Sequence, residues 1–274
     1  MELQLLILLF IIGGVAGALY ATTQVSTPLF IVSAVLLFLP ALGVELSGVL
    51  LPVIATAVVS FIPILLLEWV RDMKERKVDS VVLIALSPGA AMGGVIGAQL
   101  VSFMSPIYFK VALSILVLLL VYRGWLSARQ RLQNTNNAYL GNLNSHALRM
   151  PIGLFIGVVS MMAGGAGKIM AETVLTKSSV DDEHRHSTAV GVALFVSIAA
   201  MVGFSFPAMP LSLPNTDGFI GGIQLLSCLV LAVSQMLFYL LCREKGNRLD
   251  RLVLTIGFVL FMLIAASRVW LMAF

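Results

Sequence analysis

Residues 161–175 read "MMAGGAGKIMAETVL", a glycine-rich stretch that lies between two long apolar runs. The stretch carries Lys168 and, one helical turn later, Glu172. Glycine weakens a helix, and a charged side chain costs about 2.5 to 3.5 kcal/mol at the centre of a membrane helix. We therefore expect a membrane helix to be interrupted here, for a functional reason.

The composition places the whole chain in a membrane. Hydrophobic residues make up 59% of the 274 residues and charged residues only 11%, far from the usual globular mix. Apolar stretches long enough to cross the roughly 30 Å hydrocarbon core recur along the chain, and no polar span could build a soluble domain. We expect residues 1–274 to form one all-α integral membrane domain in contact with the lipid bilayer. The net charge of +4 is not a nucleic-acid signature.

Hydropathy and helix breakers together predict about ten helical segments. Two of these segments are too short to cross a bilayer comfortably, so we expect broken or re-entrant helices among them. The predicted segments are residues 3–19, 27–40 (short), 45–67, 79–103, 107–126, 149–163, 167–177 (short), 187–206, 218–242 and 251–272.

Basic residues predict the orientation of the chain. Fourteen of the 17 lysines and arginines fall in four loops, near residues 71–77, 123–149, 177–185 and 243–251. The positive-inside rule makes these loops cytoplasmic. The other connections hold no lysine or arginine and would face the outside; they lie near residues 40–44, 103–106 and 206–217. We expect a multi-pass protein of the cell inner membrane with both termini on the outer, periplasmic side.

The two halves of the chain show weak similarity to each other. Residues 47–63, "SGVLLPVIATAVVSFIP", align with residues 190–206, "VGVALFVSIAAMVGFSF". The predicted orientation inserts these two segments in opposite senses, which is the inverted-repeat plan of secondary transporters. We expect two inverted-topology repeats of five segments each, at residues 1–126 and 149–274, joined by a cytoplasmic linker at residues 127–148.

Each half contains one break at a corresponding place. The first half has "YATTQVSTP" at residues 20–28, and the second half has "MAGGAGK" at residues 162–168. Non-helical backbone at membrane depth must be buried against protein or line a wet cavity, and paired breaks are the best sequence pointer to a transporter's binding site. The candidate substrate-binding residues are Thr22, Thr23, Gln24, Ser26, Thr27, Gly164, Gly165, Gly167 and Lys168.

The second break and two other segments carry a family resemblance. The segments "GVVSMMAGGAGK" (residues 157–168), "TAVGVALFVS" (188–197) and "SPGAAMGGVIGAQL" (87–100), together with Pro28, resemble the TauE/SafE sulfite exporter family. The resemblance implies a membrane transporter of sulfite, sulfonates or related sulfur oxyanions. The first break departs from the family pattern, because polar residues stand where the family has a glycine run.

An anion at the second break also has independent physical support. A half-helix that starts after Gly167 points unpaired amide groups and its positive dipole end toward a ligand, next to the ammonium of Lys168. Two alternatives stay open: Lys168 and Glu172 form a structural ion pair, or both are solvated near the surface. Glu172 is the candidate for proton coupling, as the one acid that the pattern clearly buries.

The remaining polar residues do not indicate an enzyme. His146, His184 and His186 fall in predicted cytoplasmic segments, and the sequence around Ser47 lacks the context of a membrane serine hydrolase. We therefore expect no enzyme activity, no metal and no cofactor.

Together these features predict a secondary transporter that exports a small oxyanion, such as sulfite or an organosulfonate. Transport would proceed by alternating access through a midplane site at the two breaks. An anion channel is the main alternative, and an intramembrane enzyme is a more distant one. The oligomeric state is left open, with a homodimer as one alternative.

Overall fold

The structure is a computed structural model, and almost all of the part of the chain that it describes is helical. A short hairpin, β1 (Phe219–Ile220) and β2 (Ile223–Gln224), lies directly before helix α9. Most of the predicted cytoplasmic linker, residues 127–145, lies outside the described residues. The described residues are 2–38, 48–105, 107–118, 121, 146–176, 182–209, 218–243 and 251–271.

Within these residues, six helices are long and apolar enough to cross a membrane, which confirms the predicted class. They are α1 (Glu2–Thr23), α3 (Leu50–Lys74), α4 (Ser80–Ser102), α8 (Asp182–Ser205), α9 (Leu225–Arg243) and α10 (Arg251–Leu271). The shorter helices are α2 (Thr27–Phe38), Ile107–Leu118, α6 (His146–Met162) and α7 (Gly167–Thr176). With 12 and 10 residues, α2 and α7 are the two short segments that the sequence predicts.

Among the helices that extend beyond their predicted apolar segments, two change the environment of charged residues. Helix α3 continues to Lys74, and α8 begins at Asp182, so both predicted boundaries are wrong. Hydropathy falls where charged residues begin, but neither extension contains glycine or proline, so the helical hydrogen bonds continue. As a result, Glu68, Asp72 and His186 lie on helices instead of in loops.

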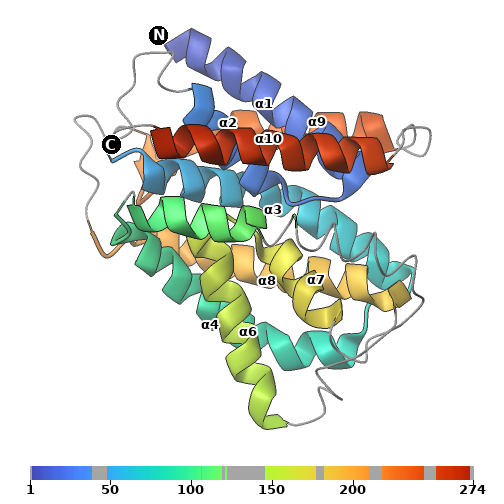
Figure 1. The fold of residues 1–274 in the computed structure, drawn as a ribbon. Helices are drawn as coiled ribbons and strands as arrows, with labels where there is room; N and C mark the ends of the chain where they lie inside the picture. Colours follow the sequence, from blue (N-terminus) through green and yellow to red (C-terminus); the bar gives the residue numbers. More distant parts are fainter. Residues whose placement is uncertain are drawn as a thin grey trace.

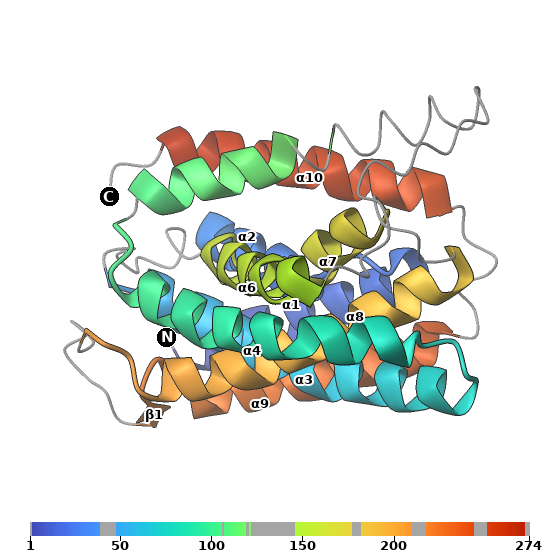
Figure 2. The same cartoon turned by 90° about the horizontal axis from the view of Figure 1, so that it is seen from below.

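The helices form three layers (Figure 2). Helices α3, α4, α8 and α9 lie in one layer, α10 and Ile107–Leu118 lie in the opposite layer, and α2, α6 and α7 lie between them. The start of α1 and the end of α10 lie on the same side of the bundle (Figure 1). The ends of α3 and α9, which carry basic residues in their last turns, lie on the other side.

Glycines bring several helices into backbone contact. Helix α4 packs against α6, and α1 packs against α9. A Cβ atom at Gly93 of α4 would lie 2.3 Å from the carbonyl oxygen of Leu154 on α6. A Cβ atom at Gly17 of α1 would lie 2.2 Å from the carbonyl oxygen of Gln235 on α9. No side chain fits at these distances, so glycine sets the spacing between the helices.

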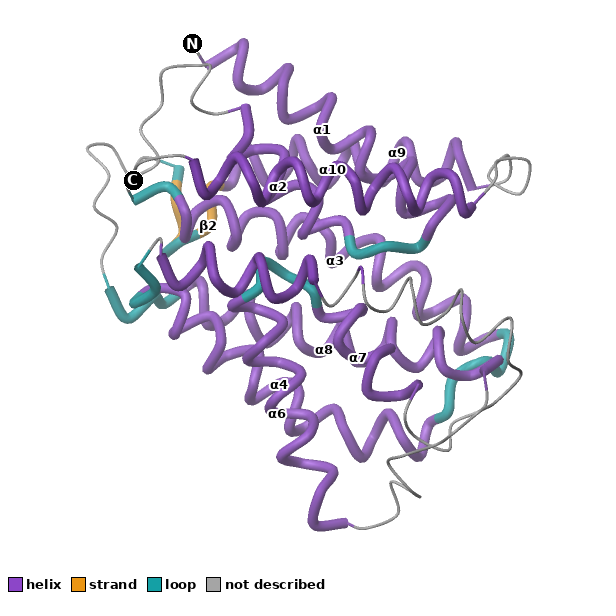
Figure 3. The backbone as a smooth tube through the Cα atoms, viewed as in Figure 1, coloured by secondary structure: helices purple, strands orange, loops and turns teal. Residues whose placement is uncertain are grey.

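The two short helices lie inside the bundle. Helix α2 packs against α1, α3 and α10, and α7 packs against α6 and α8. Figure 3 draws the breaks that precede these two helices as loops between helices. Their first residues, Thr27 and Gly167, are buried. The N-terminal ends of α2 and α7 therefore point into the protein interior.

Candidate functional site

The two breaks touch each other inside the bundle. Residues 24–26 separate α1 from α2, and residues 163–166 separate α6 from α7. Ser26 Oγ donates a hydrogen bond of 2.7 Å to the carbonyl oxygen of Gly165. A Cβ atom on Gly165 would lie 2.6 Å from Cβ of Pro28, so the close contact requires glycine. The structure thus brings together two segments that lie in different halves of the chain.

Both breaks turn through the left-handed region of backbone conformation. Gln24 has a φ of 59°, Gly164 of 80° and Gly165 of 90°. Glycine adopts such angles readily, whereas a residue with a side chain is strained by about 1 to 3 kcal/mol. The strained Gln24 lines the cavity described below. Packing around the first break therefore holds this glutamine in place.

The hydroxyl groups near the breaks have two different environments. Thr22 and Thr23 donate to backbone carbonyl groups one turn earlier, so they stabilise the end of α1. Thr27 Oγ1 and Ser160 Oγ are buried and have no hydrogen-bond partner among the described residues. Ser160 Oγ lies 2.9 Å from the point where a Cβ atom of Gly167 would sit. Unpaired hydroxyls thus lie at the starts of α2 and α7.

Lys168 is buried behind Tyr20. It is the second residue of α7, and it is only 1% exposed. Its Nζ atom donates to the Tyr20 hydroxyl at 3.0 Å and lies 4.3 Å from the centre of the tyrosine ring. The Tyr20 hydroxyl in turn donates to the carboxylate of Glu68 on α3. A tyrosine of α1 therefore connects the buried cation to a negative charge.

His186 extends this network to Glu172. Its Nδ1 atom lies 3.0 Å from Glu172 Oε1, and its Nε2 atom lies 3.6 Å from Glu68 Oε1. Lys168, Tyr20, Glu68, His186 and Glu172, from helices α1, α3, α7 and α8, thus form one polar network. Across the described ranges, no group of three or more His, Cys, Asp or Glu side chains could hold a metal ion.

Three members of this network, Tyr20, Glu68 and His186, are not among the predicted site residues. The prediction that His186 lies in a loop outside the helices is wrong. The prediction that Glu172 is the one buried acid is also wrong, because its side chain is only half-buried, whereas Glu68 is 6% exposed and Asp72 is 8% exposed. A sequence pattern could have identified these two acids. Glu68 and Asp72 directly follow an apolar run and lie one helical turn apart, so a continued helix places them on the same face.

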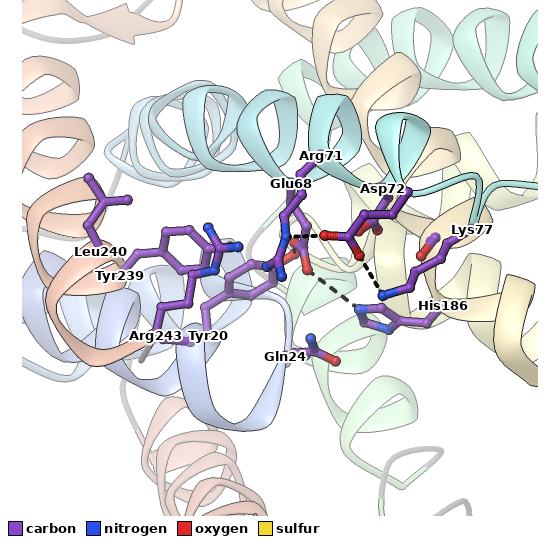
Figure 4. A pocket seen from close by; sticks show the side chains of 13 residues that line it. Tyr20, Gln24, Glu68, Arg71, Asp72, Lys77, His186, Tyr239, Leu240 and Arg243 are labelled. Atoms are coloured by element: carbon purple, nitrogen blue, oxygen red, sulfur yellow. Dashed lines mark hydrogen bonds and ion pairs between the residues drawn. The ribbon is translucent and has the colours of Figure 1, made fainter. Parts of the chain in front are cut away.

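A polar cavity of about 890 Å³ lies beside the network (Figure 4). Tyr20, Glu68 and His186 line it, and Lys168 lies behind Tyr20. The cavity lies at the ends of α3 and α9 that carry basic residues, on the side opposite to the termini. Its lining includes three acids and three bases, namely Glu68, Asp72, Glu75, Arg71, Lys77 and Arg243.

Glu75 lies between two basic side chains of this cavity. One carboxylate oxygen accepts from Arg71 Nε at 2.7 Å, and the other accepts from Lys77 Nζ at 2.5 Å. The hydrogen bonds from Lys77 and Arg71 lower the pKa of the Glu75 carboxyl, so this group stays ionised to a lower pH than usual. The Glu75 carboxylate likewise raises the pKa of Lys77. These charges are therefore fixed over the physiological pH range.

A smaller cavity of about 180 Å³ lies toward the opposite side of the bundle. Its lining comes from the starts of α1, α3 and α9, from α2 and from the hairpin of β1 and β2. Apart from Thr56, Gln224 and Ser227, the lining residues are apolar. The polar cavity and the apolar cavity therefore face opposite sides of the protein.

No curated protein and no solved structure matches the chain. A family model described as "Sulfite exporter TauE/SafE" matches residues 9–269 of the 274. The match spans both breaks and every member of the polar network. The chain therefore belongs to the TauE/SafE sulfite exporter family of multi-pass membrane proteins, which transport sulfur compounds.

Proposed function

We propose that this protein is a secondary carrier that exports a small sulfur oxyanion, sulfite or an organosulfonate, by alternating access. The observation that carries the proposal is the position of Lys168. This buried cation lies at the start of α7, next to the junction of the two breaks, and one tyrosine separates it from a polar cavity. Ionisable residues at helix breaks within a membrane mark substrate sites in transporters.

The junction of the breaks offers positive charge and donors to an anion. The first turn of a helix such as α7 leaves amide groups without intrahelical acceptors, and it carries the positive end of the helix dipole. The hydroxyls of Thr27 and Ser160 also have no hydrogen-bond partner there within the part of the chain that the structure describes. An oxyanion has several acceptor oxygens and matches this set of donors. The proposed contacts are Lys168, the three break glycines Gly164, Gly165 and Gly167, and the polar residues Gln24, Ser26 and Thr27.

The packing of the helices supports two inverted repeats, residues 1–126 and 149–274. Let α1, α2, α3 and α4 correspond to α6, α7, α8 and α9. The contact of α1 with α9 then corresponds to that of α6 with α4, and the contact of α2 with α3 to that of α7 with α8. Exchanging the two repeats swaps α3 and α8, so the contact between these two helices is unchanged. Repeats related in this way can exchange their conformations, which is the basis of alternating access.

The polar cavity and the membrane potential support export. The cavity opens beside basic residues, which the positive-inside rule places in the cytoplasm. An inward-facing cavity collects cytoplasmic anions. With the inside negative, each elementary charge that leaves as an anion gains about 2.3 kcal/mol per 100 mV. A divalent anion such as sulfite is therefore driven outward without a coupled ion.

Flux measurements on purified protein in proteoliposomes test this proposal. The panel is sulfite, sulfate, thiosulfate, taurine and sulfoacetate, with acetate as the carboxylate control. We expect saturable flux of sulfite or a sulfonate at least about tenfold faster than that of acetate. Equal rates for all anions, or no flux above that of empty vesicles, would contradict the proposal. Unitary currents in single-channel recordings would identify an anion channel instead.

A further inference from the structure

One carboxylate that lines the polar cavity lies next to Tyr20 and His186, and Tyr20 links it to Lys168. Glu68 of α3 is 6% exposed and accepts a hydrogen bond from the hydroxyl of Tyr20 on α1. The same hydroxyl accepts from Lys168 of α7 at 3.0 Å. His186 of α8 directs its Nε2 atom toward Glu68 Oε1 at 3.6 Å (Figure 4). A phenol and an imidazole thus lie next to a single buried negative group, and the phenol connects it to a cation.

The same surroundings suit a free oxyanion. Lys168 and the Tyr20 hydroxyl can donate, and so can His186 in the appropriate protonation state. Sulfite and sulfonates present what Glu68 presents, namely negative charge shared over oxygens that only accept hydrogen bonds. The site is adjacent to a cavity of about 890 Å³, which has room for such an anion. Glu68 therefore presents the same kind of hydrogen-bond acceptor as the proposed cargo.

Glu68 accepts a direct hydrogen bond from only one of these three donors, the Tyr20 hydroxyl. The distance of 3.6 Å from His186 Nε2 exceeds that of a hydrogen bond, and this buried nitrogen has no hydrogen-bond partner among the described residues. Lys168 reaches the carboxylate only through the tyrosine hydroxyl. In the protonated imidazole Nε2 is a donor without a partner, which is costly when buried, and a ligand that supplies the missing acceptor recovers that cost. The donor set thus has unused capacity for an anion.

We infer that Glu68 is an internal stand-in for the transported oxyanion. In the empty carrier its carboxylate holds Tyr20, Lys168 and His186 together, and the incoming oxyanion displaces it and takes over these three donors. This inference rests on the proposed function, because it requires that an oxyanion be the substrate. Glu68 and the substrate then compete for one site, so the acid limits affinity and helps the carrier to release its cargo.

The replacement Glu68→Gln tests the competition directly. Glutamine keeps the shape of the side chain but lacks the negative charge, so it competes less well for Lys168. We expect the variant to bind sulfite about tenfold more tightly than the wild type in isothermal titration calorimetry. Sulfite should also raise the melting temperature of the variant more than that of the wild type, because the anion replaces the missing charge.

Asp72→Asn is the matched control. Asp72 lies one turn further along the same helix, is 8% exposed and lines the same cavity. Its replacement also removes one negative charge, but from an acid outside the network of Tyr20, Lys168 and His186. We expect its sulfite affinity to change by less than about threefold. Equal effects of the two replacements would mean that only the overall charge of the cavity matters, and would overturn the inference.

Tyr20→Phe provides a second test if Glu68→Gln does not fold. Phenylalanine keeps the ring that packs against Phe61 and Tyr239, and it removes only the hydroxyl. We expect sulfite binding to weaken about tenfold, and unchanged affinity would overturn the inference. A wild-type protein that binds and moves no sulfur oxyanion would refute the proposed function itself. A wild type that transports sulfite, with Glu68→Gln unchanged in affinity, would refute only the role of Glu68.

Discussion

Lys168 is the single residue on which the transport proposal depends most. A lysine that is 1% exposed loses its hydration, and an uncompensated buried charge costs several kcal/mol. Compensation reaches it from Glu68 through the Tyr20 hydroxyl. This geometry fits two roles for Lys168. The lysine either stabilises the fold by pairing with Glu68, or it binds the substrate when the substrate replaces Glu68. These two roles differ in what happens when the ammonium group is removed.

The replacement Lys168→Met separates the two roles. Methionine fills much of the same space without the charge. If the ammonium binds substrate, sulfite affinity should fall by about 1.5 to 3 kcal/mol, or roughly ten- to a hundredfold. Calorimetry and thermal melting on the same purified sample measure affinity and stability. A large loss of stability that the added Glu68→Gln change restores, with sulfite affinity intact in Lys168→Met, would identify a purely structural lysine.

Glu172 is the candidate to carry a proton while the empty carrier returns, a step separate from the potential-driven exit of the anion. Its carboxylate lies 3.0 Å from His186 Nδ1, so the two side chains can share a proton. Glu172→Gln removes the titrating group. We expect the pH dependence of sulfite flux, measured between about pH 5 and 8, to flatten while the sulfite Kd stays within about threefold.

Glu75→Gln, at an exposed acid of the polar cavity, is the control for Glu172→Gln. An unchanged pH profile in Glu172→Gln at normal protein levels would remove the coupling role.

At the scale of the helices, close contacts between glycines and the backbone of a neighbouring helix fix the frame around the site. Gly93→Ala introduces a methyl group 2.3 Å from the carbonyl oxygen of Leu154. This overpacking should lower the free energy of unfolding by about 1 to 3 kcal/mol, seen as a lower melting temperature in detergent. Gly257 of α10 is the matched control, because a Cβ atom there meets nothing within 4 Å. Gly257→Ala should be neutral or slightly stabilising, and equal losses in both variants would contradict a packing role for Gly93.

The sequence predicts the helices better than it predicts the contacts between them. Apolar runs and the two breaks, one polar and one rich in glycine, locate the spans and both short helices, because hydropathy and helix propensity are local properties. The start of α8 is not predicted, since its first residues are charged although the backbone remains helical. The network of Tyr20, Glu68 and His186 depends on packing between three helices. No local pattern in one chain specifies which residues of distant helices meet.

At the scale of the whole molecule, the ends of the chain lie on one side and the polar cavity opens toward the other. The proposed orientation places the cavity in the cytoplasm. Reporter domains fused at each terminus should therefore report the periplasm, and a reporter inserted near Asn136 should report the cytoplasm. A cytoplasmic C-terminus beside a periplasmic N-terminus would contradict the pairing of two inverted repeats.

Sulfite efflux from proteoliposomes under an imposed membrane potential tests the central proposal most directly. An anion exporter should empty vesicles of sulfite faster when their interior is negative, because each charge that leaves gains about 2.3 kcal/mol per 100 mV. Lys168→Met, reconstituted at the same density, should lose most of this efflux. Efflux that the potential does not change, or that equals the leak of protein-free vesicles, would contradict electrogenic export of a sulfur oxyanion.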